Sequence, residues 1–545
     1  MFTDAFVILF YFLAIFSIGI YAGRKQKNLE DYALGGRSMP WWAILASLIA
    51  AEVSAATFLG APGEGFATRN FTYAQLCIGT ILGRIVVGKL FLKPYYAYNV
   101  ISIYEYLEKR FGIVTRRMAS LVFLISRVLA SGARLYFAGI LLVIGYQYVT
   151  GTSASDEQTV IMYVVSLIII TIATTIYTAI GGLKAVVWTD VLQASILAIS
   201  IISAIGVLLY HIPGGWGTVT STLTGADDWS FWSLGLGSSA EVKGIGSQIS
   251  HVLGQDYTIW AAFLGASFVT MATHGTDQDM VQRMLSAKNS STGSKAVILS
   301  GLVDLPIVMT FLLTGMLLYV YYQTNPGQSL PTSNIEIFPH FIIHSLPSGI
   351  RGLLIAGLLA TAMGSLSTAL NSLATTATKD WYQSVFRPKA SDRELLHAVK
   401  WGTVFFAILL ITVGAITAWY VVMHKNDPTV RIIPIALGIF GYTYGSLLGV
   451  FLLGMLTKKR GSDLGNCLAM LTGFLVVGIL SKLIPMPESM ADKLPVIAFP
   501  WRVTIGTLAT MAIGILFRSK AEVVEASRIA KAISDREDQR LKNLR

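Results

Sequence analysis

Long apolar stretches recur along almost the whole chain, and short polar segments separate them. A helix needs about 20 consecutive apolar residues to cross the hydrocarbon core of a bilayer. We therefore expect an all-α polytopic membrane protein with about 13 transmembrane helices. The predicted spans are residues 4–22, 40–60, 73–92, 119–149, 159–180, 185–210, 256–278, 297–323, 348–378, 401–422, 432–456, 463–484 and 499–517.

Composition supports a bilayer as the surrounding solvent. Hydrophobic residues make up 54% of the 545 positions and charged residues 13%, whereas soluble domains carry about 25% charged residues. The net charge of +11 would fit nucleic-acid binding, but basic cytoplasmic loops explain it better, so we expect no nucleic-acid partner. Cys77 and Cys467 both lie in apolar runs, which favours neither a disulfide framework nor a zinc site.

The loops alternate in their content of lysine and arginine. The loop after the first span and every second loop from there hold 21 Lys and Arg residues, and the opposite loops hold seven. Because cytoplasmic loops carry the excess of basic residues, this bias predicts a plasma-membrane protein with its N-terminus outside and its C-terminus in the cytoplasm. We expect residues 518–545 to form a cytoplasmic tail.

Two predicted spans contain polar residues at membrane depth. Span 40–60 includes small residues around Glu52, and span 256–278 includes the run 270–277 with His274. An ionisable residue inside a span costs about 2.5–3.5 kcal/mol, so each is a candidate functional residue. Interrupted helices persist where they line a cavity, and their freed carbonyls suit a sodium ion. The two spans lie five apart, which predicts matching positions in two inverted five-helix units.

Span 348–378 carries a row of hydroxyl residues. Thr361, Ser365 and Thr368 share one helical face beside Gly364. The pattern fits two interpretations equally well: close packing through small residues, or oxygen ligands for a hard cation. Several further spans contain charges: Arg84, Arg127, Arg134, Asp190, Asp277, Asp279 and Asp304. Structural ion pairing is the simpler expectation for each of them, and binding of an anionic solute is the alternative for the arginines.

The run Tyr177–Gln193, with its paired glycines and the sequence Trp188-Thr189-Asp190, resembles the signature of the sodium/solute symporter family. Further similarity lies at 40–43, 105–111, 278–283 and 370–372. The resemblance implies a leucine-transporter-type fold with two inverted five-helix repeats. On that basis we expect the following division: 1–39, peripheral first span and loop; 40–210, first repeat; 211–255, outside loop; 256–456, second repeat; 457–517, two peripheral spans; and 518–545, tail.

The resemblance also implies ion sites, with Na⁺ as the coupling ion. The main sodium site would use backbone oxygens of Ala50, Val53 and Thr361 and the hydroxyl of Ser365. Family members usually have a second serine where this chain has Gly364, so one side-chain ligand is missing. A second sodium site, present in some members, would map to Asp190, Ser367 and Thr368.

The implied solute-binding positions depart from each well-known branch of the family. Positions used by sugar carriers fall on Glu52, Cys77 and Asp304, where the residue types differ, and the tyrosine that closes one sugar site falls on Thr273 beside His274. Sialic acid carriers have residues matching Ser54 and Thr57, and their substrate-binding arginine falls near Arg127. The sequence therefore does not name the solute.

The function that the resemblance implies is sodium-coupled symport of a small organic solute (a sugar, polyol, carboxylate or amino acid) into the cell by alternating access. A proton-coupled transporter or a transporter-like sensor of the same fold are the alternatives. An enzyme is disfavoured because no zinc spacing, phosphate loop or nucleophile elbow is present. We expect a monomer or weak oligomer whose partners are the solute, sodium and the lipid bilayer.

Overall fold

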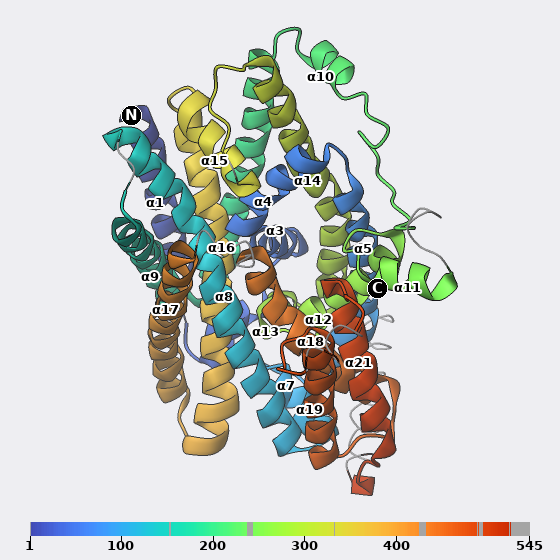
Figure 1. Ribbon diagram of the computed structural model, residues 1–545. Coiled ribbons are helices and arrows are strands. Elements are labelled where there is room, and N and C mark those ends of the chain that lie inside the picture. The colour runs from blue at the N-terminus through green and yellow to red at the C-terminus, as the bar shows by residue number, and fades with distance from the viewer. Residues whose placement is uncertain are drawn as a thin grey trace, which may run out of the picture.

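The computed structural model describes residues 2–24, 26–151, 154–236, 244–331, 333–424, 432–487, 489, 494–522 and 524. The named elements within these residues are all helices (Figure 1). They are α1 Phe2–Ala22, α2 Leu29–Leu34, η1 Gly35–Arg37, α3 Trp41–Glu52, α4 Ala55–Thr68, η2 Thr72–Gln75, α5 Leu76–Val86, η3 Val87–Phe91, α6 Leu92–Ala97, α7 Tyr104–Arg110, α8 Ile113–Thr150, α9 Asp156–His211, α10 Trp216–Thr222, α11 Ile245–Leu253, η4 Ala261–Ala266, α12 Ser267–Gly275, α13 Gln278–Leu285, α14 Ser290–Thr324, α15 Asn334–Ser345, α16 Ile350–Thr376, η5 Ala377–Phe386, α17 Asp392–Met423, α18 Ile432–Leu456, α19 Asp463–Leu480 and α21 Phe499–Leu516.

Ten helices among the described residues are long and apolar enough to cross a membrane, or up to eleven if the bent pair α3 and α4 counts as one span. The number is lower than the predicted thirteen for two reasons. The predicted spans 159–180 and 185–210 lie in the single 56-residue element α9, and the predicted span 256–278 is divided among η4, α12 and α13. The predicted tail at 518–545 lies mostly outside the described residues.

The paired glycines of α9 have a steric reason. Gly182 interrupts the helix with φ 55° and ψ −157°, and a Cβ there would lie 2.5 Å from the Tyr32 carbonyl oxygen. The backbone at Gly181 lies close to Gly23, which directly follows α1. A Cβ added at Gly23 would lie 2.3 Å from the Gly181 Cα. Only glycine permits both this conformation and this contact. The pair therefore positions α1 and α2 against α9, beside the rest of the core.

Helix α16 lies inside the bundle and packs against α9, α8, α1 and α3 (Figure 1). Of its most apolar stretch, 83% is buried inside the protein, compared with 17% for α1. The outward face of α1 carries large apolar side chains such as Phe6 and Phe10, which are exposed. Such a contiguous exposed apolar surface is stable in lipid and not in water.

The first turn of α1 is tied to the start of α16. Asp4 Oδ1 accepts hydrogen bonds from the amides of Gly349 at 2.7 Å and Gly352 at 2.9 Å. The N-terminus and the segment containing α15, which precedes α16, therefore lie at the same end of the bundle (Figure 1). The connection between α16 and α17, where η5 ends, lies at the opposite end.

Candidate functional site

The first predicted helix interruption lies at Val53 and Ser54. Helix α3 ends at Glu52, α4 begins at Ala55, and the two helices meet at an angle of 67°. Val53 has ψ 90°, which turns the chain out of the helical path. Among the described residues, no backbone amide donates to the carbonyl of Ala50 or Val53. Two carbonyl oxygens are thus left with free lone pairs in the middle of a span.

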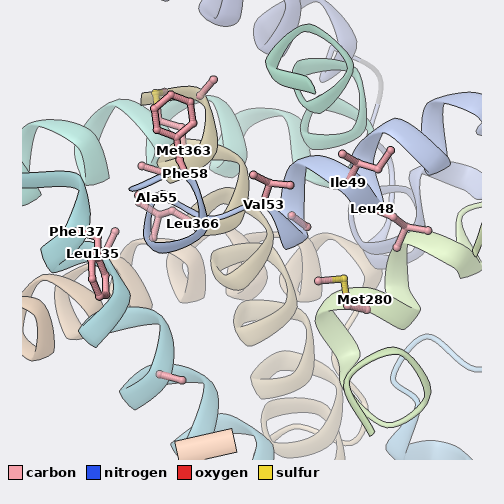
Figure 2. Packing of buried hydrophobic residues seen from close by; sticks show 14 of the residues in the cluster. Leu48, Ile49, Val53, Ala55, Phe58, Leu135, Phe137, Met280, Met363 and Leu366 are labelled. Carbon is pink, nitrogen blue, oxygen red and sulfur yellow. The ribbon is translucent and has the colours of Figure 1, made fainter. Parts of the chain in front are cut away.

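The helix that faces this break is α16. A Cβ added at Gly364 would lie 3.1 Å from the Ala50 carbonyl oxygen, so the glycine allows α3 to approach α16 closely. Figure 2 shows packed side chains around this place, including Val53 at the break and Leu366 of α16. The Ser365 hydroxyl donates to the Thr361 carbonyl at 3.0 Å or the Ala362 carbonyl at 3.1 Å, which leaves its oxygen lone pairs available.

The break and Ser365 of α16 lie beside a cavity. The cavity has a volume of about 190 Å³, and Ser365 lines it together with Glu52 and Ser54. Backbone carbonyls and hydroxyls are the hard donors that a sodium ion or another hard cation prefers. Metal ligation by three or more His, Cys, Asp or Glu residues is not found among the described residues.

The residues expected for a second sodium site are engaged by an arginine. Arg283 of α13 is fully buried, and its Nη2 lies 3.1 Å from Asp190 Oδ2 and donates to the Thr368 hydroxyl. Ser47 also donates to Asp190 Oδ2. Ser367 donates its own hydroxyl to the Gly364 carbonyl at 3.0 Å. A guanidinium of the chain itself thus lies where the second ion was expected.

The predicted solute-binding residues divide between two cavities. Ser54, Arg127, Thr273 and His274 line the 190 Å³ cavity, which is bounded by α3, α4, α8, α12, α13, α16 and α18. Thr57, Cys77 and Asp304 line a second cavity of about 210 Å³, bounded by α4, α5, α12 and α14. Glu52 lines both.

Arg127 is held by two carboxylates. Its Nη2 pairs with Asp277 and its Nη1 lies 2.9 Å from Asp279 Oδ2. The hydroxyl of Tyr444, in α18, donates to the same Asp277. The interruption between α12 and α13, where Asp277 lies, is therefore bound to α8 and α18 at one end of the first cavity. Arg127 therefore lines the cavity with both aspartates bound to its guanidinium.

Arg134, two helical turns after Arg127, has a different environment. Its guanidinium lies over the Phe440 ring at 4.5 Å, and its Nε is shielded from solvent without a hydrogen-bond partner. Among the described residues no carboxylate lies within ion-pair distance of it. The seven-residue spacing of Arg127 and Arg134 puts both on one helical face, but the sequence does not reveal which of the two arginines is unpaired.

An ionic cluster lies where the two cavities meet. Glu52 Oε1 accepts a hydrogen bond from the fully buried Arg84 and lies 3.1 Å from His274 Nε2. Arg84 Nη1 also donates to Ser300 at 3.0 Å. Asp304 Oδ2 lies 3.6 Å from Arg84 Nη2, beyond hydrogen-bond distance. Glu52 of α3 is thus bound to Arg84 of α5 and to His274 of α12, and Arg84 in turn contacts α14 through Ser300.

Comparisons with known proteins agree with this geometry. A family model described as the sodium:solute symporter family matches residues 32–473. The chain is 27% identical over 472 residues to the sodium/sialic acid symporter NanT of Aliivibrio fischeri, which covers 85% of this chain and 84% of that protein. It is 28% identical to sodium/glucose cotransporter 1 of Oryctolagus cuniculus, covering 87% of this chain and 71% of that protein. It is also 28% identical to sodium-coupled monocarboxylate transporter 1 of Mus musculus, covering 87% of this chain and 72% of that protein.

A solved structure shares the fold. The substrate-bound outward-open state of a Na⁺-coupled sialic acid symporter superposes with a TM-score of 0.76 and 24% sequence identity, covering 95% of this chain and 97% of that one. A nucleobase-cation-symport-1 family transporter matches with a TM-score of 0.51 and 14% identity, covering 92% of this chain and 94% of that one. The all-helical, leucine-transporter-type fold that we predicted is confirmed.

Proposed function

The chain belongs to the sodium:solute symporter family, and we propose that it carries a small organic solute into the cell together with sodium by alternating access. The observation that carries this proposal is the break at Val53 and Ser54, which frees the carbonyls of Ala50 and Val53. The Ala50 carbonyl lies against Gly364 of α16, next to Ser365, which lines the 190 Å³ cavity. Sodium binds there to the backbone oxygens of Ala50, Val53 and Thr361 and to the Ser365 hydroxyl.

Sodium binding couples the broken helix formed by α3 and α4 to α16. It fixes α3 and α4 against α16, and so orders the broken helix that contacts the solute. The repeats at 40–210 and 256–456 then rock against each other around the occupied site. One sodium ion crossing 100 mV releases about 2.3 kcal/mol, which corresponds to a roughly fifty-fold solute gradient.

The solute occupies the cavities beside the break. We assign the unpaired Arg134 to a carboxylate of the solute, because a partly buried guanidinium without an ion-pair partner is costly and a bidentate carboxylate satisfies it. Ser54, Thr273 and His274 supply hydrogen bonds in the same cavity. Thr57, Cys77 and Asp304 contact the part of the solute in the second cavity, and Glu52 lies between them.

The same proposal includes the setting of the transporter. We place it in the plasma membrane with its N-terminus and the segment containing α15 outside and its C-terminus in the cytoplasm, as the distribution of Lys and Arg among the loops favours. It acts as a monomer or weak oligomer and performs no chemistry on the solute.

The test uses purified full-length protein. Its melting temperature is measured in sodium and in choline at fixed pH, with a panel of sugars, polyols, carboxylates and amino acids. We expect a carboxylate-bearing solute to raise the melting temperature in sodium only, and to be taken up by proteoliposomes down an imposed sodium gradient. Arg134→Gln should lose the response to that solute and keep the response to sodium.

Other outcomes contradict the proposal in distinct ways. A solute response that follows pH and is equal in choline and sodium would favour proton coupling. Sodium-dependent binding without uptake would favour a sensor. A solute response restricted to neutral sugars, unaffected by Arg134→Gln, would leave the sodium site intact and refute the carboxylate assignment.

A further inference from the structure

The second cavity has a polar wall that the sodium site does not use. It lies between α5 and α14 and has a volume of about 210 Å³. Asp304 lines it beside the Thr80 hydroxyl, and its described ion-pair contact is the 3.6 Å approach to Arg84. Its carboxylate is about five-sixths buried, with 17% of the side chain exposed. A largely buried carboxylate therefore faces an open volume without a cation in hydrogen-bond contact.

The charges around this cavity do not balance. Arg84 is one guanidinium, and two carboxylates, Glu52 and Asp304, lie against it. Glu52 takes the closer contact with Arg84 and a further one with His274, which reaches no second carboxylate among the described residues. Because an uncompensated charge at membrane depth is costly, the excess negative charge on the Asp304 side favours a bound cation.

The neighbouring ionic cluster does not supply that cation. Its acidic members are Asp190, Asp277 and Asp279, and its basic members are Arg127, Arg134 and Arg283. Asp277 and Asp279 pair with Arg127, and Asp190 and Asp279 pair with Arg283, so these two arginines are already engaged. Arg134 lines the first cavity and not the second. The unbalanced negative charge is thus confined to the cavity between α5 and α14.

The rest of the cavity lining suits an organic cation. Tyr73 and Phe311 contribute aromatic rings, and Thr57 and Thr80 contribute hydroxyls. The Tyr73 ring is held by an edge contact with Tyr257, with centroids 5.1 Å apart and planes at 86°. Aromatic rings beside a carboxylate are a recurring environment for ammonium and guanidinium groups. A cavity of this size has room for an ammonium or guanidinium group together with its substituents. Binding of a proton alone would not need such a volume.

We propose that the cavity between α5 and α14 binds a positively charged nitrogen, an ammonium or guanidinium group, of the transported solute, with Asp304 as its counter-ion. The inference rests on the proposed function, since the carboxylate of the same solute is held by Arg134 in the adjoining cavity. The solute is accordingly a zwitterion that extends past Glu52 from one cavity into the other.

Cys77 provides a direct test, because it lines this cavity and is one of two cysteines in the chain. In a Cys467→Ala background, Cys77 is the single thiol. Two methanethiosulfonate reagents of similar size, the cationic 2-aminoethyl and the anionic 2-sulfonatoethyl compound, are applied, and each rate is divided by its rate with a free thiol in solution. We expect the cationic reagent to react at least about tenfold faster, since a nearby unit charge attracts one and repels the other.

Two variants and one protection experiment complete the test. Asp304→Asn should remove the preference, and Thr80→Val, which changes the same wall without changing charge, should keep it. Methylammonium or guanidinium should slow labelling of Cys77 in the unsubstituted cavity, which tests the site even if Asp304→Asn fails to fold. Equal normalised rates, faster anionic labelling, or the absence of labelling by both reagents would each overturn the inference.

Matched solutes separate this inference from the proposed function. Sodium-dependent stabilisation is compared for 5-aminopentanoate and pentanoate, which differ in the amine. We expect the amino acid to bind at least about tenfold more tightly than the plain acid, and Asp304→Asn to abolish the difference. Equal, sodium-dependent binding of both would refute the cationic site and leave the symporter intact, whereas the absence of any sodium response would refute the symporter proposal itself.

Discussion

Replacing Ser365 by alanine gives the sharpest test of the sodium site. The side-chain oxygen is the single hydroxyl ligand that we assign there, because the chain has Gly364 at the neighbouring position. Ser365 is partly buried at the cavity wall, so removing its oxygen costs little packing. An interaction of a polar group with a charge contributes about 1.5–3 kcal/mol, and each 1.4 kcal/mol is tenfold in affinity. We expect the sodium Kd to rise about ten- to a hundredfold.

The matched control is Thr361→Val. The Thr361 hydroxyl donates to the Leu358 carbonyl at 2.8 Å, and its backbone oxygen is the group that we assign to sodium. Valine keeps the backbone and the branched shape, so the sodium Kd should change by less than about threefold. Both variants are titrated with sodium, with choline keeping the ionic strength constant, and the melting temperature reports binding. Unchanged affinity in Ser365→Ala, or a greater loss in Thr361→Val, would refute the assigned ligand set.

Three further predictions concern the ion pairs and one histidine pair. Arg127→Gln should lower the melting temperature by more than Arg134→Gln, because breaking a buried ion pair costs about 3–5 kcal/mol and Arg134 has no carboxylate partner among the described residues; equal losses would contradict these pairings. Sodium activation of uptake should follow a Hill coefficient near one, since Arg283 occupies Asp190 and its neighbours; a coefficient near two would show a second ion. Burial and the neighbouring His344 lower the pKa of His340, in α15, to about 4. Because the folded pKa lies below the ordinary value of about 6.5, the contribution of His340 to stability is complete above pH 6.5 and is lost between pH 6.5 and 4. Melting temperatures over that range should fall less steeply in His340→Phe, and parallel curves would contradict the assignment.

The helix interruption at Glu52 could be predicted because small and polar residues in the middle of an apolar span weaken the helix and rarely persist there without lining a cavity. The bend at Val53 and the two free carbonyls agree with that prediction. The glycine pair at 181 and 182 could likewise be recognised as a pattern, but its reason lies in Gly23 and Tyr32, which are far away in the sequence. Fewer long helices than thirteen are found because Gly182 interrupts α9 between the predicted spans 159–180 and 185–210 without ending the element, and because η4, α12 and α13 divide the span 256–278, in which the sequence predicts an interruption.

The partners of the buried charges could not be predicted. Arg127 and Arg134 lie seven residues apart on one face of α8, yet Asp277 and Asp279 pair with the first and not the second. Those aspartates lie 150 or more residues further along the chain. The direction in which their side chains point depends on the interruption between α12 and α13. The same holds for Arg283, whose guanidinium takes up the position expected for a second sodium ion.

The sequence by itself determined the solvent, the all-helical class, the family and the places where spans are interrupted, because these follow from local hydropathy and from short runs of neighbouring residues. The tertiary structure decided which charges balance, which arginine stays unpaired and where the excess carboxylate Asp304 faces a cavity. These properties depend on distances between helices that are remote in the chain. At membrane depth, where charges are poorly screened, a few ångströms separate a structural ion pair from a binding site.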